Sequence, residues 1–150
     1  IQFYGGFDWE KSANIRHKVM EMVLRENGCE VISVNMEWDA MSYSYNKNII
    51  HKYWDIIKDT DGCMTNDIGA LSCLAVARQM GLEVPGQFKI IGYDGTEITN
   101  LTYPELSVIE QDCPGIAREC VDAVLSLIEG RDPDTCLRLV PVHWRGRGTT

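Results

Sequence analysis

The sequence has no long apolar run and no cluster of basic residues. No stretch approaches the roughly 18 consecutive apolar residues of a membrane-spanning helix. The formal net charge is −8, with 14 lysines and arginines against 22 acidic residues. This balance opposes contact with nucleic-acid phosphates, which needs clustered positive charge. Arg145 and Arg147 are only a pair, which we interpret as part of a solvated tail, so we expect neither membrane nor DNA contact from these residues.

The sequence also lacks the short motifs of common enzyme classes. It contains no Gly-x-Ser-x-Gly elbow, no Gly-x-x-x-x-Gly-Lys-Ser/Thr loop and no Gly-x-Gly-x-x-Gly fingerprint after a strand. His17, His51 and His143 are scattered along the chain, and we interpret each as a surface or half-buried histidine. Carboxylate pairs cannot be assigned from sequence alone, so an enzyme of the same fold class stays an alternative. The sequence predicts a protein that is not an enzyme and carries no cofactor.

The six cysteines show no pattern of a metal site. None forms a Cys-x-x-Cys pair, and no histidine lies at zinc-site spacing from them. Cys63 falls in an apolar strand-like run, and Cys73 and Cys120 fall in helical patterns. We interpret the cysteines as free thiols that act as small apolar side chains. Free thiols favour a reducing compartment, so the sequence predicts a cytoplasmic protein.

Strand and helix patterns alternate along the chain. Ile15, Val19, Met22 and Val23 form one apolar stripe of a helix, and similar stripes recur in the later helical segments. This alternation predicts an α/β fold with a doubly wound, mostly parallel sheet. The predicted strands are 1–4, 31–36, 62–65, 88–92, 106–109 and 137–144, and the predicted helices are 11–27, 42–58, 67–80 and 114–129.

The chain begins at Ile1 inside a strand-like run. The sequence shows no initiator methionine, no basic n-region and no apolar h-region of a signal peptide. We therefore interpret it as a fragment of a longer protein.

Five residues at predicted strand ends or helix starts are candidates for ligand binding: Arg16, Trp38, Asn66, Asp94 and Gln111. The ends of parallel strands converge on one edge of a sheet, where α/β proteins bind their ligands. A guanidinium, an amide and a carboxylate beside an indole ring suit the hydroxyl groups and the apolar face of a polyol.

Each candidate also has an ordinary structural alternative. Arg16 can pair with a nearby glutamate in solvent, and Trp38 can fill the core. Asn66 can cap the helix that follows it, and Asp94 can form an Asx-turn with Gly95. Gln111 can be a polar residue that simply ends a strand.

Several motifs occur in an order that resembles the effector-binding core of the lactose-repressor (LacI/GalR) family. The resemblance covers essentially the whole chain, and Gly95 stands where some members have an acidic or polar residue. The motifs are Gly5-Gly6 with Ser12 and Arg16, Glu37 to Ser42, Thr65 to Leu71, Gly81 to Pro85, Ile91 to Asp94, Tyr103 to Asp112 and the final Arg-Gly-Arg-Gly-Thr-Thr.

The resemblance implies a periplasmic-binding-protein-like, three-layer α/β/α subdomain. Residues 1–106 and 141–150 would form the C-terminal subdomain, and residues 107–140 would pack in the N-terminal subdomain. The helix over 114–129 would then expose its apolar stripe when that partner is missing, and we expect association of the fragment.

The resemblance also implies a bacterial transcriptional regulator that binds a sugar-like effector between two subdomains. The match carries effector contact onto Arg16, Trp38, Asn66, Asp94 and Gln111. A homodimer or higher oligomer would contact operator DNA only through an absent N-terminal helix-turn-helix. The alternatives are a periplasmic sugar-binding transport protein and a fragment that binds nothing because half of its cleft is missing.

Overall fold

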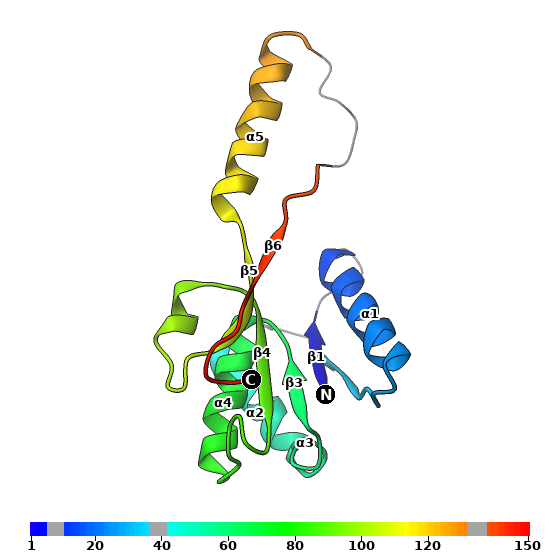
Figure 1. Cartoon of the computed structure of the whole chain (residues 1–150), viewed down its shortest axis with the longest axis vertical. Coiled ribbons are helices and arrows are strands. Elements are labelled where there is room, and N and C mark those ends of the chain that lie inside the picture. Colours follow the sequence, from blue (N-terminus) through cyan, green and yellow to red (C-terminus); the bar gives the residue numbers. More distant parts are fainter. Residues whose placement is uncertain (6–10, 37–41, 132–137) are drawn as a thin grey trace.

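The computed structural model describes residues 1–5, 11–36, 42–131 and 138–150. These residues form one sheet with the strand order β2-β1-β3-β4-β5-β6 (Figure 1). The strands are β1 (Gln2–Gly5), β2 (Ser33–Met36), β3 (Gly62–Met64), β4 (Lys89–Asp94), β5 (Ser107–Gln111) and β6 (Val142–Arg145). The helices are α1 (Lys11–Glu26), α2 (Tyr43–Lys52), α3 (Trp54–Ile57), α4 (Asp67–Gln79), α5 (Cys113–Ile128) and the 3-10 helix η1 (Glu97–Asn100).

Strands β1 to β5 are parallel, and β6 runs antiparallel to β5. The chain crosses the sheet in opposite directions after β1 and after β2. Because crossovers between parallel strands are right-handed, α1 lies on the opposite face from α2 and α4. Figure 1 shows α2 and α4 side by side and α1 apart from them. The predicted doubly wound, mostly parallel fold is confirmed.

The core lies between the sheet and the helices α2 and α4. Its largest fully buried apolar side chains come from β4, β5, the residues just before them and the covering helices. Burial of each apolar side chain of this size stabilises the folded state by about 1.5–3 kcal/mol. This packing anchors β4 and β5, the two strands that lead to the candidate site. The buried side chains are Ile50, Ile57, Val76, Phe88, Ile90, Leu106 and Val108.

The prediction of one helix over 42–58 is wrong. The segment forms α2 and α3, which meet at Tyr53, a residue with φ −101° and ψ 12°. The apolar periodicity continues across the break, so the pattern alone does not reveal it. The predicted start of the next helix is confirmed, because Asp67 lies in the first turn of α4.

Helices α1 and α5 both carry exposed apolar side chains. α5 extends away from the rest of the molecule beyond the ends of β5 and β6 (Figure 1). Its Ile128 is 76% exposed, and Ile15 on α1 is 61% exposed. The predicted exposure of the α5 stripe is confirmed. The stripe of α1 is also exposed, although an apolar stripe on a surface helix usually faces the core. The exposed side chains are Ile15, Val19, Met22, Val23, Ile116, Val121, Val124, Leu125, Leu127 and Ile128.

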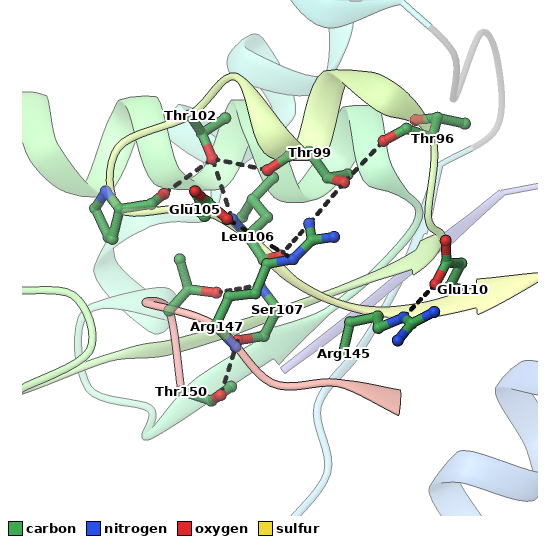
Figure 2. A network of polar contacts seen from close by, with 12 residues as sticks. Thr96, Thr99, Thr102, Glu105, Leu106, Ser107, Glu110, Arg145, Arg147 and Thr150 are labelled. Carbon is green, nitrogen blue, oxygen red and sulfur yellow. Dashed lines mark hydrogen bonds and ion pairs between the residues drawn. The ribbon is translucent and has the colours of Figure 1, made fainter. Parts of the chain in front are cut away.

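The interpretation of the C-terminal end as a solvated tail is wrong for Arg147. Its guanidinium Nη1 donates to Thr99 Oγ1 at 3.0 Å and to the carbonyl of Leu106 at 3.1 Å (Figure 2). Thr149 is fully buried. Its buried hydroxyl is satisfied, since it accepts from the Ser107 amide at 2.9 Å and donates to the Ile90 carbonyl at 2.7 Å. The tail is therefore bound to β4 and β5.

In the described part of the chain, no helix is both long and apolar enough to cross a membrane.

Candidate functional site

The site begins at a sharp corner where β4 ends. Asp94 has φ 118°, and Gly95 has φ 74°. Positive φ at a residue with a Cβ costs about 1–3 kcal/mol and persists only when its surroundings hold it. Gly95 lies against β5, because a Cβ there would be 2.7 Å from the Cα of Glu110. The chain therefore turns tightly here and presents the Asp94 carboxylate at the strand end.

Two of the other predicted ligand-binding residues contact this carboxylate. Arg16 Nη1 is 3.3 Å from Asp94 Oδ1, and Gln111 Nε2 donates to the same oxygen at 2.5 Å. The Arg16 guanidinium also lies over the ring of Tyr93, 4.2 Å from its centroid, a geometry that favours a cation. Arg16 thus pairs with Asp94 and not with a glutamate on its own helix. The structure brings together three residues that are far apart in the sequence.

A cavity of about 670 Å³ opens beside these residues, large enough for a small ligand. Its lining is mainly apolar with several polar side chains among it, so the cavity suits a molecule that carries hydroxyl groups on an apolar frame. Asp94 is not itself a lining residue, but it holds two residues that are, Arg16 and Gln111. The polar lining residues are Arg16, Tyr93, Gln111, Asp112, Glu119 and Arg138, and the apolar ones are Ile15, Ile116, Ala123, Leu139, Val140 and Val142, together with the Cys120 thiol.

The remaining predicted residues lie differently. Asn66 caps α4, because its Oδ1 accepts from the Gly69 amide at 2.7 Å. The helix cap expected for Asn66 is confirmed, and its predicted ligand contact, which a cap does not exclude, stays a prediction. Trp38 lies outside the described residues, so its predicted ligand contact stays a prediction.

Asp67 is a buried carboxylate that the sequence patterns did not assign to the site. It is 3% exposed, and its Oδ2 accepts from the Thr96 amide at 2.6 Å and from the Thr96 hydroxyl at 2.7 Å. Burial raises the pKa of Asp67, the Thr96 hydrogen bonds oppose that rise, and the nearby charge of Asp94 adds to it. The position of Asp67 directly after Asn66 was the only sequence signal.

The described residues contain no group of three or more His, Cys, Asp or Glu side chains that could hold a metal ion. The cysteines of the described chain are unpaired, and Cys63 and Cys73 are buried. The arrangement offers hydrogen-bond donors and acceptors at the rim of an apolar cavity.

Comparison with known proteins identifies the family. The family model of a periplasmic binding protein-like domain matches residues 1–150. The chain is 36% identical to the sucrose operon repressor of Streptococcus mutans over 69 residues. This aligned region covers 46% of this chain and 22% of that protein. It is 35% identical over 92 residues to the ribose operon repressor of Bacillus subtilis, with 61% of this chain and 28% of that protein covered.

Solved structures agree with this match. A lac repressor dimer bound to operator and the anti-inducer ONPF superposes with a TM-score of 0.84 at 25% identity, over 99% of this chain and 51% of that chain. A LacI family regulator from Arthrobacter in complex with lactose superposes with a TM-score of 0.80 at 22% identity, over 99% of this chain and 56% of that chain. This chain therefore spans well under two thirds of the length of these relatives. The chain belongs to the periplasmic binding protein-like domain family, in the form found in the effector-binding core of LacI/GalR transcriptional regulators.

Proposed function

We propose that this chain is the effector-binding part of a bacterial LacI-type transcriptional regulator, and that its effector is a sugar-like polyol. The observation that carries the proposal is the Asp94 carboxylate at the end of β4, which is bonded to Arg16 and Gln111, two residues that line the cavity. Among the described residues both donors use Oδ1, so Oδ2 stays available to accept from a ligand hydroxyl. The lactose complex of a regulator with the same fold supports a sugar as the ligand.

In this proposal the effector closes a cleft between two subdomains. Residues 1–106 and 141–150 form the C-terminal subdomain, and residues 107–140, which include α5, pack in an N-terminal subdomain. The exposed apolar side chains of α5 support this arrangement, because they need a partner surface. The ligand can shift the equilibrium between the open and closed states only by as much as its affinities for the two states differ.

The regulatory output follows from the same proposal. A cytoplasmic homodimer contacts operator DNA through a helix-turn-helix headpiece that precedes this chain, and effector binding changes its affinity for the operator. The operator-bound lac repressor dimer with the same fold supports this output. The net charge of −8 agrees with DNA contact outside these residues.

The test is calorimetric binding of sucrose, ribose and lactose to the full-length regulator. Arg16→Ala and Asp94→Ala each remove a partner of a charge-assisted hydrogen bond, so we expect affinity to fall by roughly 10- to 150-fold, about 1.5–3 kcal/mol. Arg25→Ala is the matched control, because Arg25 lies on the same helix, is exposed and pairs only with Glu21 among the described residues. Unchanged affinity in the Arg16 and Asp94 variants would refute the site.

A periplasmic transport receptor is the second candidate function, because the matching family model describes a periplasmic binding protein-like domain. The unpaired buried thiols Cys63 and Cys73 favour the regulator. Operator binding by the full-length protein that changes with effector concentration supports the regulator. Sugar binding without any DNA binding supports the receptor.

A further inference from the structure

The carboxylate of Asp67 is buried close to the Asp94 corner but does not line the cavity. Its Oδ2 accepts two hydrogen bonds from one residue, Thr96, through both the backbone amide and the hydroxyl. Its Oδ1 is buried and has no hydrogen-bond partner among the described residues. A buried carboxylate is costly to desolvate, so a residue that serves only as core filling would be apolar.

The hydrogen bonds between Asp67 and Thr96 act directly beside the corner at the end of β4. Thr96 follows Asp94 and Gly95, the two consecutive residues with positive φ. The β4–β5 pairing fixes the corner from one side, because Asp94 pairs with Glu110. The Asp67–Thr96 hydrogen bonds fix it from the other side. A residue held in a rare backbone conformation needs such restraint on both sides.

Strand β4 leaves room for this contact. A Cβ at Gly92 would be 2.8 Å from Asp67 Oδ1 and 3.0 Å from Val108 Cγ1. The Asp67 carboxylate therefore lies directly over a strand position that has no side chain. This close approach places a residue of α4 against the strand that ends at Asp94.

We propose that Asp67 is a positioning residue for the effector site: by holding Thr96, it fixes the corner at which the Asp94 carboxylate meets Arg16 and Gln111. Its effect on ligand affinity rests on the function proposed above, whereas its effect on the corner does not. Asp67 makes no contact with the effector.

The first test uses the Gln111 side-chain amide, which donates to Asp94, as a reporter of the corner. Its NMR signal is followed in full-length protein made with isotope-labelled glutamine and is assigned with Gln111→Leu. Asp67→Leu keeps the volume but removes both acceptor oxygens. Asp67→Asn keeps an acceptor oxygen for Thr96. We expect the Gln111 signal to move toward that of an exposed glutamine in the leucine variant and to stay near its wild-type position in the asparagine variant.

The control acts on the other end of the same loop. Arg147 donates to Thr99 Oγ1, and Thr99 in turn donates to the Thr96 carbonyl (Figure 2). Arg147→Gln loosens η1 without touching Asp67, so the Gln111 signal should stay in place. A Gln111 signal that is unmoved in Asp67→Leu, or moved equally in Arg147→Gln, would overturn the proposal. If Asp67→Leu does not fold, Thr96→Val removes one of the two donors and should move the signal in the same direction. An unmoved signal in the Thr96 variant would then overturn the proposal as well.

A binding measurement separates this inference from the proposed function. With whichever of sucrose, ribose or lactose binds the wild-type protein, Asp67→Leu should weaken binding by about tenfold, the lower end of the range seen when a residue that orients a metal ligand is lost. Asp67→Asn should recover most of that loss. If Arg16→Ala weakens binding and Asp67→Leu does not, the positioning role is wrong and the effector site stands. If none of the three sugars binds, the sugar assignment fails, and the Gln111 signal alone decides on Asp67.

Discussion

Gly95→Ala is the substitution that most directly tests the geometry of the corner. Gly95 has φ 74°, and a Cβ there would be 2.7 Å from the Cα, Cβ and Cγ of Glu110. Two costs therefore add. An alanine in this left-handed conformation costs about 1–2 kcal/mol, and the overlap with β5 adds about 1–3 kcal/mol if it relaxes as overpacked cores do. We expect the free energy of unfolding to fall by roughly 2–5 kcal/mol.

Gly81→Ala is the matched control for this prediction. Gly81 has φ 77°, almost the same as Gly95, but a Cβ there would meet nothing within 4 Å. Its substitution therefore carries the conformational cost alone, about 1–2 kcal/mol. The difference between the two variants isolates the overlap with β5.

Urea denaturation followed by tryptophan fluorescence measures both losses of stability. Calorimetry with a sugar that the wild-type protein binds then measures the site. Only Gly95→Ala should weaken binding, because only Gly95 adjoins Asp94. Equal losses of stability in both variants, together with wild-type affinity in Gly95→Ala, would refute the account of the corner.

Three further predictions concern the tail, the buried carboxylate and α5. Thr149→Val keeps the side-chain shape but leaves the Ser107 amide and the Ile90 carbonyl without their partner, so the free energy of unfolding in urea should fall by about 2–5 kcal/mol. Thr150→Val, at an exposed residue, is the control. A loss of the same size in the control would contradict this reasoning. Burial raises the pKa of Asp67 above 3.8, so the folded protein binds the Asp67 proton more tightly than the unfolded chain does. The resulting contribution to stability is present in acid and is lost as the pH rises from about 3.8 through the raised pKa. Asp67→Asn should remove this part of the pH dependence of the unfolding midpoint, and an unaltered profile would count against it. The double substitution Leu127→Lys and Ile128→Lys, at two exposed residues of α5, should lower the self-association of the 150-residue chain in light scattering. An unchanged apparent mass would place the associating surface elsewhere.

The mostly parallel sheet and the edge that carries the site follow from the sequence for a clear physical reason. Parallel strands alternate with helices, and polar residues follow the strands, so Asp94 and Gln111 were expected at one edge of the sheet. The structure adds that Arg16 reaches this edge from a helix 78 positions earlier. The motif pattern placed Arg16 near the ligand, but periodicity alone does not give such a long-range contact.

The failures have a common cause, because local pattern does not report the environment. The stripe on α1 has helical spacing, yet Val19 and Met22 are exposed, since spacing identifies an apolar face and not its partner. The C-terminal residues lack any strand or helix pattern, yet Thr149 is buried through hydrogen bonds to strands far away in the sequence. The role of Asp67 depends on Thr96, which lies 29 positions later.

The attachment of the tail also sets an order of events during synthesis. The Thr149 hydroxyl binds the Ile90 carbonyl across 59 positions of sequence, and the amide of Ile90 binds the Thr149 carbonyl in return. A growing chain that has released β4 and β5 from the ribosome still lacks these bonds. Closing so long a loop comes late, because its entropy cost must be met before the contact forms. The backbone groups of Ile90 and Ser107 that bind Thr149 therefore stay without these partners until the last residues of the tail have left the ribosome.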